Sequence, residues 1–220
     1  YTYYHKLKGL ATEYNTRFLF ETNVGASLPI IGTLNDLLRS GDSIHSMEAV
    51  LSGTLNFVFN NYNGSSSFAS VVKQAQQEGY TEPDPRLDLS GKDDMRKIMI
   101  LVRESGTVME MEDISNLSFM PEACMQGSVE DFYLSMEEHE EHFKKIYNDA
   151  LAAGCKLKFV ASYKDGKAKV GLQHIHPQHD FYHLYGKDNI VLFYTDRYAD
   201  QPLVIKGAGA GAALTASGVF

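Results

Sequence analysis

The dipeptide Asp165-Gly166, between the apolar runs 156–163 and 167–175, is the feature that most constrains the fold. An Asp-Gly turn accommodates positive φ at both central residues and joins two neighbouring antiparallel strands. The segment therefore predicts a β-hairpin. Further strand-like runs follow at 189–198 and 202–207, so we expect the last part of the chain to form mainly strands.

Helical patterns that stop at glycines dominate the sequence before this hairpin. Residues 67–78 predict an amphipathic helix ending before Gly79, and residues 90–104 predict a second helix with a core-facing stripe. The run 17–25 reads instead as a short buried strand. No repeat, low-complexity tract or linker interrupts the pattern, so we expect one mixed α and β domain.

Composition limits the classes of partner. The 220 residues carry 28 acidic against 20 basic side chains, a net charge of −8 and an isoelectric point near 5.4. Such a chain lacks the basic surface that binding to nucleic acids or anionic membranes requires. The sequence also contains no run of 18 consecutive apolar residues, the length needed to span a bilayer. Cys124 and Cys155 form no CxxC pair and lie among apolar neighbours, which favours core thiols in a reducing, cytoplasmic compartment.

The densest group of polar residues lies in GYTEPDPRLDLSGKDDMRK, residues 79–97. Ser90 is expected to cap the second helix, with Asp93 at the capping-box spacing and Lys97 four residues further on the same face. Asp93 and Lys97 could form only a surface pair worth about 0.2–0.5 kcal/mol. Alternatively, Glu82, Asp93 and Lys97 converge on a zwitterion, with the carboxylates holding its amine and the lysine an oxygen.

Two glycine-containing segments allow close approach of a ligand. GAGAGA, residues 207–212, fits a degenerate dinucleotide fingerprint but lacks the acidic residue about 20 positions downstream that a Rossmann unit requires. It predicts either a ligand-facing turn or a tight strand-to-helix turn. ETNVGASLP, residues 21–29, places a glutamate before small residues whose carbonyls could bind a hard cation.

Four histidines at the spacing HxHx2Hx3H invite comparison with a transition-metal site. They are His174, His176, His179 and His183. The HExxH motif is absent, and a proline interrupts the segment at 177. Polar rim positions are therefore the favoured interpretation.

Four blocks of the chain resemble the homoserine dehydrogenase family in order and spacing. They are FLFETNVGASLPIIGTLNDLLRSGD, VLSGTLNFVFN, EGYTEPDPRLDLSGKDDMRKIMIL and GAGAGAALTASGVF. TEPDP followed by LSGxDxxRK is highly specific. The ETNVG form is most similar to the homoserine dehydrogenase half of bifunctional aspartokinase–homoserine dehydrogenases.

The resemblance implies NAD(P)-dependent interconversion of aspartate 4-semialdehyde and homoserine, a step toward threonine, isoleucine and methionine. It assigns proton transfer at the substrate oxygen to Lys97, with Asp93 beside it in the catalytic helix. It assigns binding of the amino-acid substrate to Glu82 and Asp93. Gly79 and Gly211 would approach the nicotinamide cofactor.

The resemblance also implies a monovalent cation, commonly sodium, held by a glutamate and nearby main-chain carbonyls. The matching positions are Glu21, Val24, Ala26 and Leu28. Ser27 stands where the family often has glycine, which bears on the geometry of this loop.

The implied fold is α+β, a mixed sheet with helices packed on one face, similar to the C-terminal domain of two-domain dehydrogenases that form homodimers. Family members carry a Rossmann domain that residues 1–220 lack, so we expect a catalytic and dimerisation fragment without its nucleotide-binding domain and without the end of its last helix. Alone, this fragment is expected to be inactive or nearly so. A dimerisation module without chemistry, or another dehydrogenase on the same plan, are the alternatives.

Overall fold

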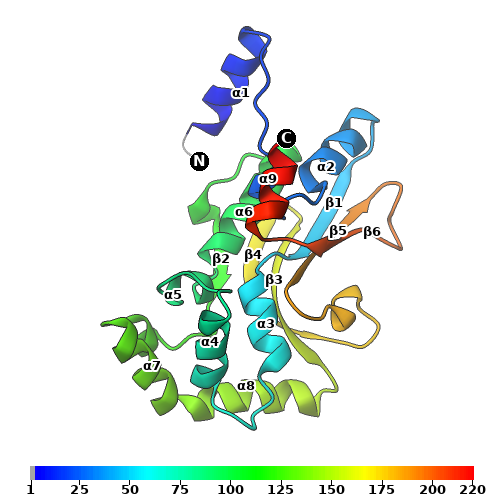
Figure 1. Cartoon of the computed structure of the whole chain (residues 1–220). Helices are drawn as coiled ribbons and strands as arrows, with labels where there is room; N and C mark the ends of the chain where they lie inside the picture. The colour runs from blue at the N-terminus through cyan, green and yellow to red at the C-terminus, as the bar shows by residue number, and fades with distance from the viewer. Residues whose placement is uncertain (1–2) are drawn as a thin grey trace.

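A six-stranded mixed sheet organises the computed structural model, which describes residues 3–220 (Figure 1). The strand order is β2-β4-β3-β1-β5-β6, with β2 and β4 parallel and every other neighbouring pair antiparallel. The strands are β1 (Ile44–Val50), β2 (Ile114–Leu117), β3 (Lys156–Lys164), β4 (Lys167–Ile175), β5 (Asp188–Thr195) and β6 (Leu203–Ala208). The expected α+β class is confirmed.

Along the chain, the helices lie before, between and after the strands. The α-helices are α1 (Tyr4–Glu13), α2 (Ile30–Arg39), α3 (Gly53–Asn61), α4 (Phe68–Gln77), α5 (Arg86–Leu89), α6 (Lys92–Glu104), α7 (Val129–Glu138), α8 (Glu140–Ala152) and α9 (Ala212–Val219). Short 3₁₀ turns are η1 (Glu21–Asn23), η2 (Met111–Asp113), η3 (Glu122–Met125) and η4 (Asp180–His183). No helix among residues 3–220 is long and apolar enough to cross a membrane.

The predicted hairpin is confirmed at β3 and β4. Asp165 and Gly166 have φ of 52° and 75°, and the register places Lys164 opposite Lys167. Both turn residues therefore adopt the left-handed conformation that a two-residue turn requires.

The two faces of the sheet bury two separate groups of side chains. Along β5, Val191 and Phe193 belong to the large core under the helices, whereas Ile190 and Leu192 belong to a smaller cluster with Phe181 of η4. This alternation follows from the period of two along a strand. The main helices thus cover one face, and the η4 segment covers part of the other.

The segment 17–25 does not form the predicted strand. It contains η1, and Gly25 and Ala26 have φ of 77° and 53°. The Glu21 carboxylate accepts hydrogen bonds from the N–H groups of Ile31 at 2.7 Å and Gly32 at 2.6 Å. The segment therefore turns to meet the N-terminus of α2, where unpaired N–H groups attract an anionic side chain.

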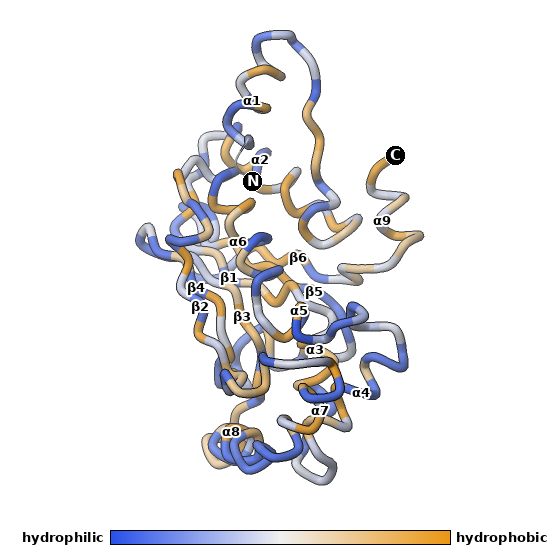
Figure 2. The backbone as a smooth tube through the Cα atoms, turned by 90° about the vertical axis from the view of Figure 1, so that its left-hand side faces the viewer, coloured by the Kyte–Doolittle hydropathy of each residue, from blue (hydrophilic) through white to orange (hydrophobic). Residues whose placement is uncertain are grey.

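Helix α1 stands out from the sheet at one end of the molecule, as two views agree (Figures 1 and 2). The Tyr4 ring packs edge-on against the Phe20 ring, the Tyr4 hydroxyl donates to the Glu104 carboxylate, and Lys8 forms an ion pair with that carboxylate at 3.0 Å. The Glu104 side chain is only 1% exposed. This carboxylate, in the last turn of α6, therefore anchors α1 to the core.

A second buried charge lies on β3. Lys158 is 0% exposed and donates to the side-chain oxygens of Asn56 and Asn60, both on α3, and to the carbonyl of Leu184. Burial lowers the pKa of Lys158 to about 7. Three acceptors from two segments therefore tie α3 and the loop after η4 to the centre of the sheet.

Helix α6 begins at Lys92, and the predicted cap at Ser90 is wrong. The N-cap is Gly91, at φ 71°, and the Ser90 hydroxyl instead donates to the Leu87 carbonyl while accepting the Lys92 N–H at 3.3 Å. A Cβ at position 91 would lie 2.6 Å from the Phe159 ring, so only glycine fits at this left-handed position. The helix therefore begins without a side-chain cap.

We predict that G91A lowers the free energy of unfolding by about 2–4 kcal/mol, because backbone strain adds to a collision with a buried ring. The matched control is G106A, since Gly106 also has positive φ, at 93°, but open space around its Cβ. That control should lose only about 1 kcal/mol. Denaturant unfolding measures both, and equal losses would contradict the packing argument.

Candidate functional site

Lys97 lies on the face of α6 that meets the end of β1. Its ammonium group forms an ion pair with the Asp93 carboxylate at 2.9 Å and donates to the Leu51 carbonyl at 2.8 Å. The Lys97 side chain is 18% exposed against 55% for Asp93. The predicted shared face is confirmed. The interaction is more than a surface pair, because the lysine is mostly buried and reaches a main-chain oxygen far away in sequence.

The loop that carries Glu82 is held to the start of α3. The Asp88 carboxylate accepts the Glu82 N–H at 2.9 Å. The Thr54 hydroxyl shares its single proton between the Tyr80 carbonyl and the Asp88 carboxylate, which lies 3.2 Å away. The Glu82 side chain is exposed. Since Leu51 and Thr54 are three residues apart, Glu82 and Lys97 are both tied to one short stretch.

Sequence reasoning missed Asp88. Burial is the main cause that raises its pKa above the usual range, while hydrogen bonds from Glu82 and Thr54 oppose that rise. The only available signal was its place inside the dense polar block at 79–97. Its role in the structure is to shape the loop that presents Glu82.

Sequence reasoning also missed Asp94, the neighbour of Asp93. Its side chain is 1% exposed, and neither carboxylate oxygen has a hydrogen-bond partner among residues 3–220. Burial raises the pKa of Asp94 to about 7, against the attraction of Lys97 and with the repulsion of Asp93 and Asp88. A carboxyl group that is largely neutral below pH 7 therefore lies beside the Lys97–Asp93 pair.

The glycines predicted to approach a cofactor lie at two turns. Gly79, at φ 74°, follows α4, and nothing lies within 4 Å of a Cβ built there. Gly211, at φ 128°, precedes α9 and is exposed. Such bare main chain lets a planar ring come close, so both glycines fit a nicotinamide group.

The rest of the glycine-rich turn packs against the site. A Cβ on Gly207 would lie 3.0 Å from the side chain of Leu28, and one on Gly209 would lie 2.1 Å from that of Asn189. Asn189 itself donates to the Leu51 carbonyl at 3.1 Å. This segment therefore approaches Leu28 of the expected cation loop through Gly207, and through Gly209 it approaches the asparagine that donates to the Leu51 carbonyl.

The expected cation loop, residues 21–28, forms a compact turn under α9. Val24 and Ala26 are buried, Leu28 is half-buried, and Gly218 of α9 approaches Ser27 closely. Both Glu21 oxygens already accept main-chain N–H groups, but a carboxylate retains further lone pairs. One carboxylate with nearby carbonyls fits a hard cation.

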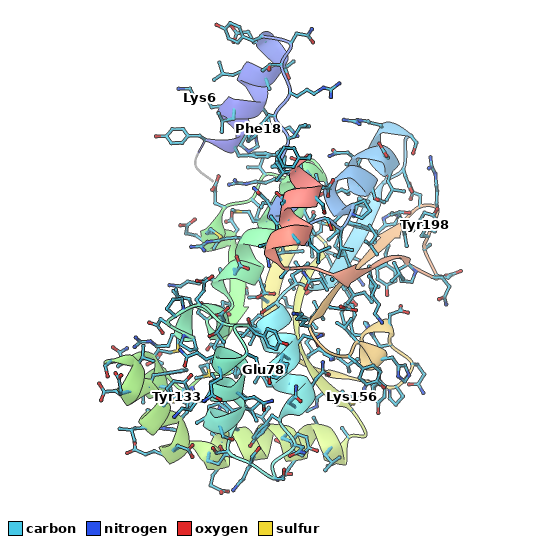
Figure 3. All side chains as sticks on the ribbon, in the orientation of Figure 1. Lys6, Phe18, Glu78, Tyr133, Lys156 and Tyr198 are labelled. Atoms are coloured by element: carbon cyan, nitrogen blue, oxygen red, sulfur yellow. The ribbon has the colours of Figure 1, made fainter. Side chains whose placement is uncertain are left out.

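A cavity of about 750 Å³ opens beside this loop, between α1, α2 and the end of α9. Glu21, Gly32 and Glu104 line it, and so does Phe18, which Figure 3 labels near the end of α9. The candidate catalytic residues are not among its lining residues. The cavity therefore belongs to the Glu21 side of the molecule.

The four histidines do not form a metal site among residues 3–220. His179 contacts the Glu48 carboxylate at 3.0 Å, and His174, His176 and His183 are exposed. Within residues 3–220, no group of three or more His, Cys, Asp or Glu side chains could hold a metal ion.

Cys124 and Cys155 are buried free thiols, which confirms the prediction of core thiols.

We predict that Asp94 makes the stability of the protein fall between about pH 4 and pH 7. In that window the carboxyl group ionises in the unfolded chain but stays protonated in the folded one, so unfolding becomes easier as pH rises. The loss is on the order of 4 kcal/mol and is constant above pH 7. Denaturant unfolding of D94N should lack this decline, and parallel pH profiles for D94N and the original chain would contradict it.

Comparison with known proteins gives the same family along nearly the whole chain. The homoserine dehydrogenase family model matches residues 29–220. The chain is 43% identical over 220 residues to a chloroplastic bifunctional aspartokinase/homoserine dehydrogenase from Zea mays, covering 99% of this chain and 24% of the relative. The chain thus spans about a quarter of that relative's length.

Solved structures share the fold. A protein of unknown function from Candida auris matches with a TM-score of 0.85 and 39% identity, covering 90% of this chain and 57% of the other. A hyperthermophilic archaeal homoserine dehydrogenase mutant in complex with NADPH matches with a TM-score of 0.74 and 25% identity, covering 99% and 57%. Because the family model matches residues 29–220, which is most of its length, the chain belongs to the homoserine dehydrogenase family.

Proposed function

We propose that this chain is the catalytic, substrate-side part of an enzyme that interconverts aspartate 4-semialdehyde and homoserine with NAD(P). The observation that carries this proposal is the Lys97 ammonium group, held between the Asp93 carboxylate and the Leu51 carbonyl. A largely buried lysine with two fixed acceptors can deliver a proton along a defined direction.

In the reducing direction, Lys97 donates its proton to the aldehyde oxygen, and the neutral amine then regains a proton from solvent. A reduced nicotinamide cofactor, if bound beside Gly79 and Gly211, would supply the hydride for the carbonyl carbon. In the oxidising direction, the neutral Lys97 amine takes the hydroxyl proton.

The substrate's ammonium group would bind the carboxylates of Glu82 and Asp93. The Glu82 side chain is exposed and its main chain is fixed by Asp88, while Asp93 is half-exposed beside Lys97. Two carboxylates that bind the ammonium group, with a lysine for the reacting oxygen, would match a zwitterionic substrate. This arrangement limits the orientations open to the bound amino acid.

Cofactor and cation follow from the same resemblance. NAD or NADP would approach Gly79 and Gly211, consistent with the NADPH complex of the archaeal relative. Sodium or another monovalent cation would bind the Glu21 carboxylate and the main-chain oxygens of Val24, Ala26 and Leu28.

The wider context is also a proposal. We place the enzyme in the biosynthesis of threonine, isoleucine and methionine, in the cytoplasm, with no nucleic-acid or membrane partner. Maize relatives are chloroplastic by name.

We propose that two copies pair as a homodimer through the sheet face that the main helices leave uncovered. We also propose that catalysis needs a nucleotide-binding domain joined to residues 1–220.

We predict that K97M lowers kcat about 10²–10⁴-fold in the full enzyme, because the general acid and base is lost. Turnover of aspartate 4-semialdehyde with NADPH measures this. The control is K92M, an exposed lysine on the same helix, which should keep its turnover and its unfolding midpoint. Near-normal turnover in K97M would sink the assignment.

We predict that sodium chloride stabilises the protein beyond an equal concentration of choline chloride, because only sodium fits the Glu21 loop. A tenfold excess over the dissociation constant corresponds to about 1.4 kcal/mol, or a rise in Tm of roughly 3–6 °C. E21Q should lose this difference. D36N, an exposed change on α2, should keep it. Identical melting curves in the two salts would count against the cation site.

A further inference from the structure

Asn189, in β5, shares an acceptor with the candidate catalytic lysine. Its side-chain N–H donates to the Leu51 carbonyl at 3.1 Å, and Lys97 donates to the same oxygen at 2.8 Å. Asn189 is 1% exposed. A carbonyl oxygen has two lone pairs, so these two donors satisfy it fully.

The glycine-rich turn lies close to the Asn189 amide. A Cβ on Gly209 would fall 2.1 Å from the Asn189 Cγ and 2.2 Å from its Nδ2, so only a residue without a side chain fits there. The register of β5 and β6 places Asn189 opposite Gly207. The amide is therefore clamped between the Leu51 carbonyl and the main chain of the turn that leads to α9.

The orientation of this amide follows from its neighbours. Its oxygen could not face the Leu51 carbonyl, because two acceptors would repel each other, so the N–H group points there. The Asn189 Oδ1 is then left buried without a hydrogen-bond partner among residues 3–220. An unpaired buried acceptor lowers stability, so the asparagine is poorly explained as a purely stabilising residue.

We propose that Asn189 is a positioning residue for Lys97: it fixes the Leu51 carbonyl that aims the ammonium group, and it links the glycine-rich turn to the lysine. This inference rests on the proposed function of Lys97. Asn189 itself is not placed in contact with substrate. Its effect is to set where the proton donor sits, and small misplacements of such a group lower turnover steeply.

Two substitutions separate positioning from packing, in the full enzyme assayed with NADPH and aspartate 4-semialdehyde. N189L keeps the branching and the number of side-chain heavy atoms, and it removes both the donor and the unpaired oxygen. We expect it to fold with an unchanged or raised unfolding midpoint, to lower kcat about 10- to 100-fold, and to change KM less than threefold.

N189D provides a pH-dependent test. Its carboxyl group, with a pKa raised by burial, can donate to the Leu51 carbonyl when protonated but repels that oxygen and holds the lysine proton when ionised. We expect kcat to recover toward the original value at low pH and to fall at least tenfold at high pH, relative to the unsubstituted enzyme.

The matched control is T195V. Thr195 is a fully buried polar residue in the same strand whose hydroxyl accepts hydrogen bonds from Arg197 and Tyr198 rather than from the site. T195V should keep the kcat and pH profile of the original enzyme, even if its unfolding midpoint falls.

Normal kcat and pH profile in both Asn189 variants would overturn the inference, as would losses that follow the unfolding midpoint and appear equally in T195V. K97M separates the two levels of the argument. If K97M retains turnover, the proposed function of Lys97 fails, and the positioning role fails with it. If K97M is inactive while the Asn189 variants are normal, only the positioning role fails.

Discussion

The main-chain carbonyl of Leu51 is the acceptor on which the site depends. It lies directly after β1, in the interior of the sheet, and takes donors from α6 and β5. A main-chain oxygen cannot change rotamer, so the group that it holds inherits the rigidity of the central strands. Thr54, three residues later, holds the loop of Glu82 through Asp88. One turn of chain thus organises residues from three distant segments.

Unpaired buried polar atoms gather at this place. Four such side-chain atoms occur among residues 3–220, and three of them belong to Asp94 and Asn189. Buried polar groups nearly always have hydrogen-bond partners in folded proteins, so a cluster of unpaired ones lowers the stability of the fold at this site. The remaining core shows why the chain can tolerate it: large apolar side chains such as Phe68 and Phe132 are completely buried beneath the helices.

Local signals in the sequence predicted local structure well. The Asp165-Gly166 turn and the four-residue spacing of Asp93 and Lys97 need only the geometry of neighbouring residues, and both were confirmed. The run 17–25 failed as a strand because apolar character alone does not distinguish a strand from a packed turn. A contact across 46 residues, such as Lys97 with Leu51, has no local signal. The burial of Asp94 and Asn189 is a tertiary property for the same reason.

The anchoring of α1 bears on where the folding unit starts. The family match begins at residue 29, yet Glu104, at the end of α6, relies on Tyr4 and Lys8 to neutralise and pair its carboxylate. A truncation at the family boundary would remove both of these donors and leave Glu104, in the final turn of the helix that carries Lys97, with the longer hydrogen bond from Asn35 at 3.4 Å. The family match begins about two dozen residues after the first side chain that pairs with Glu104. A truncated protein designed for expression should therefore keep the residues from Tyr4 onward.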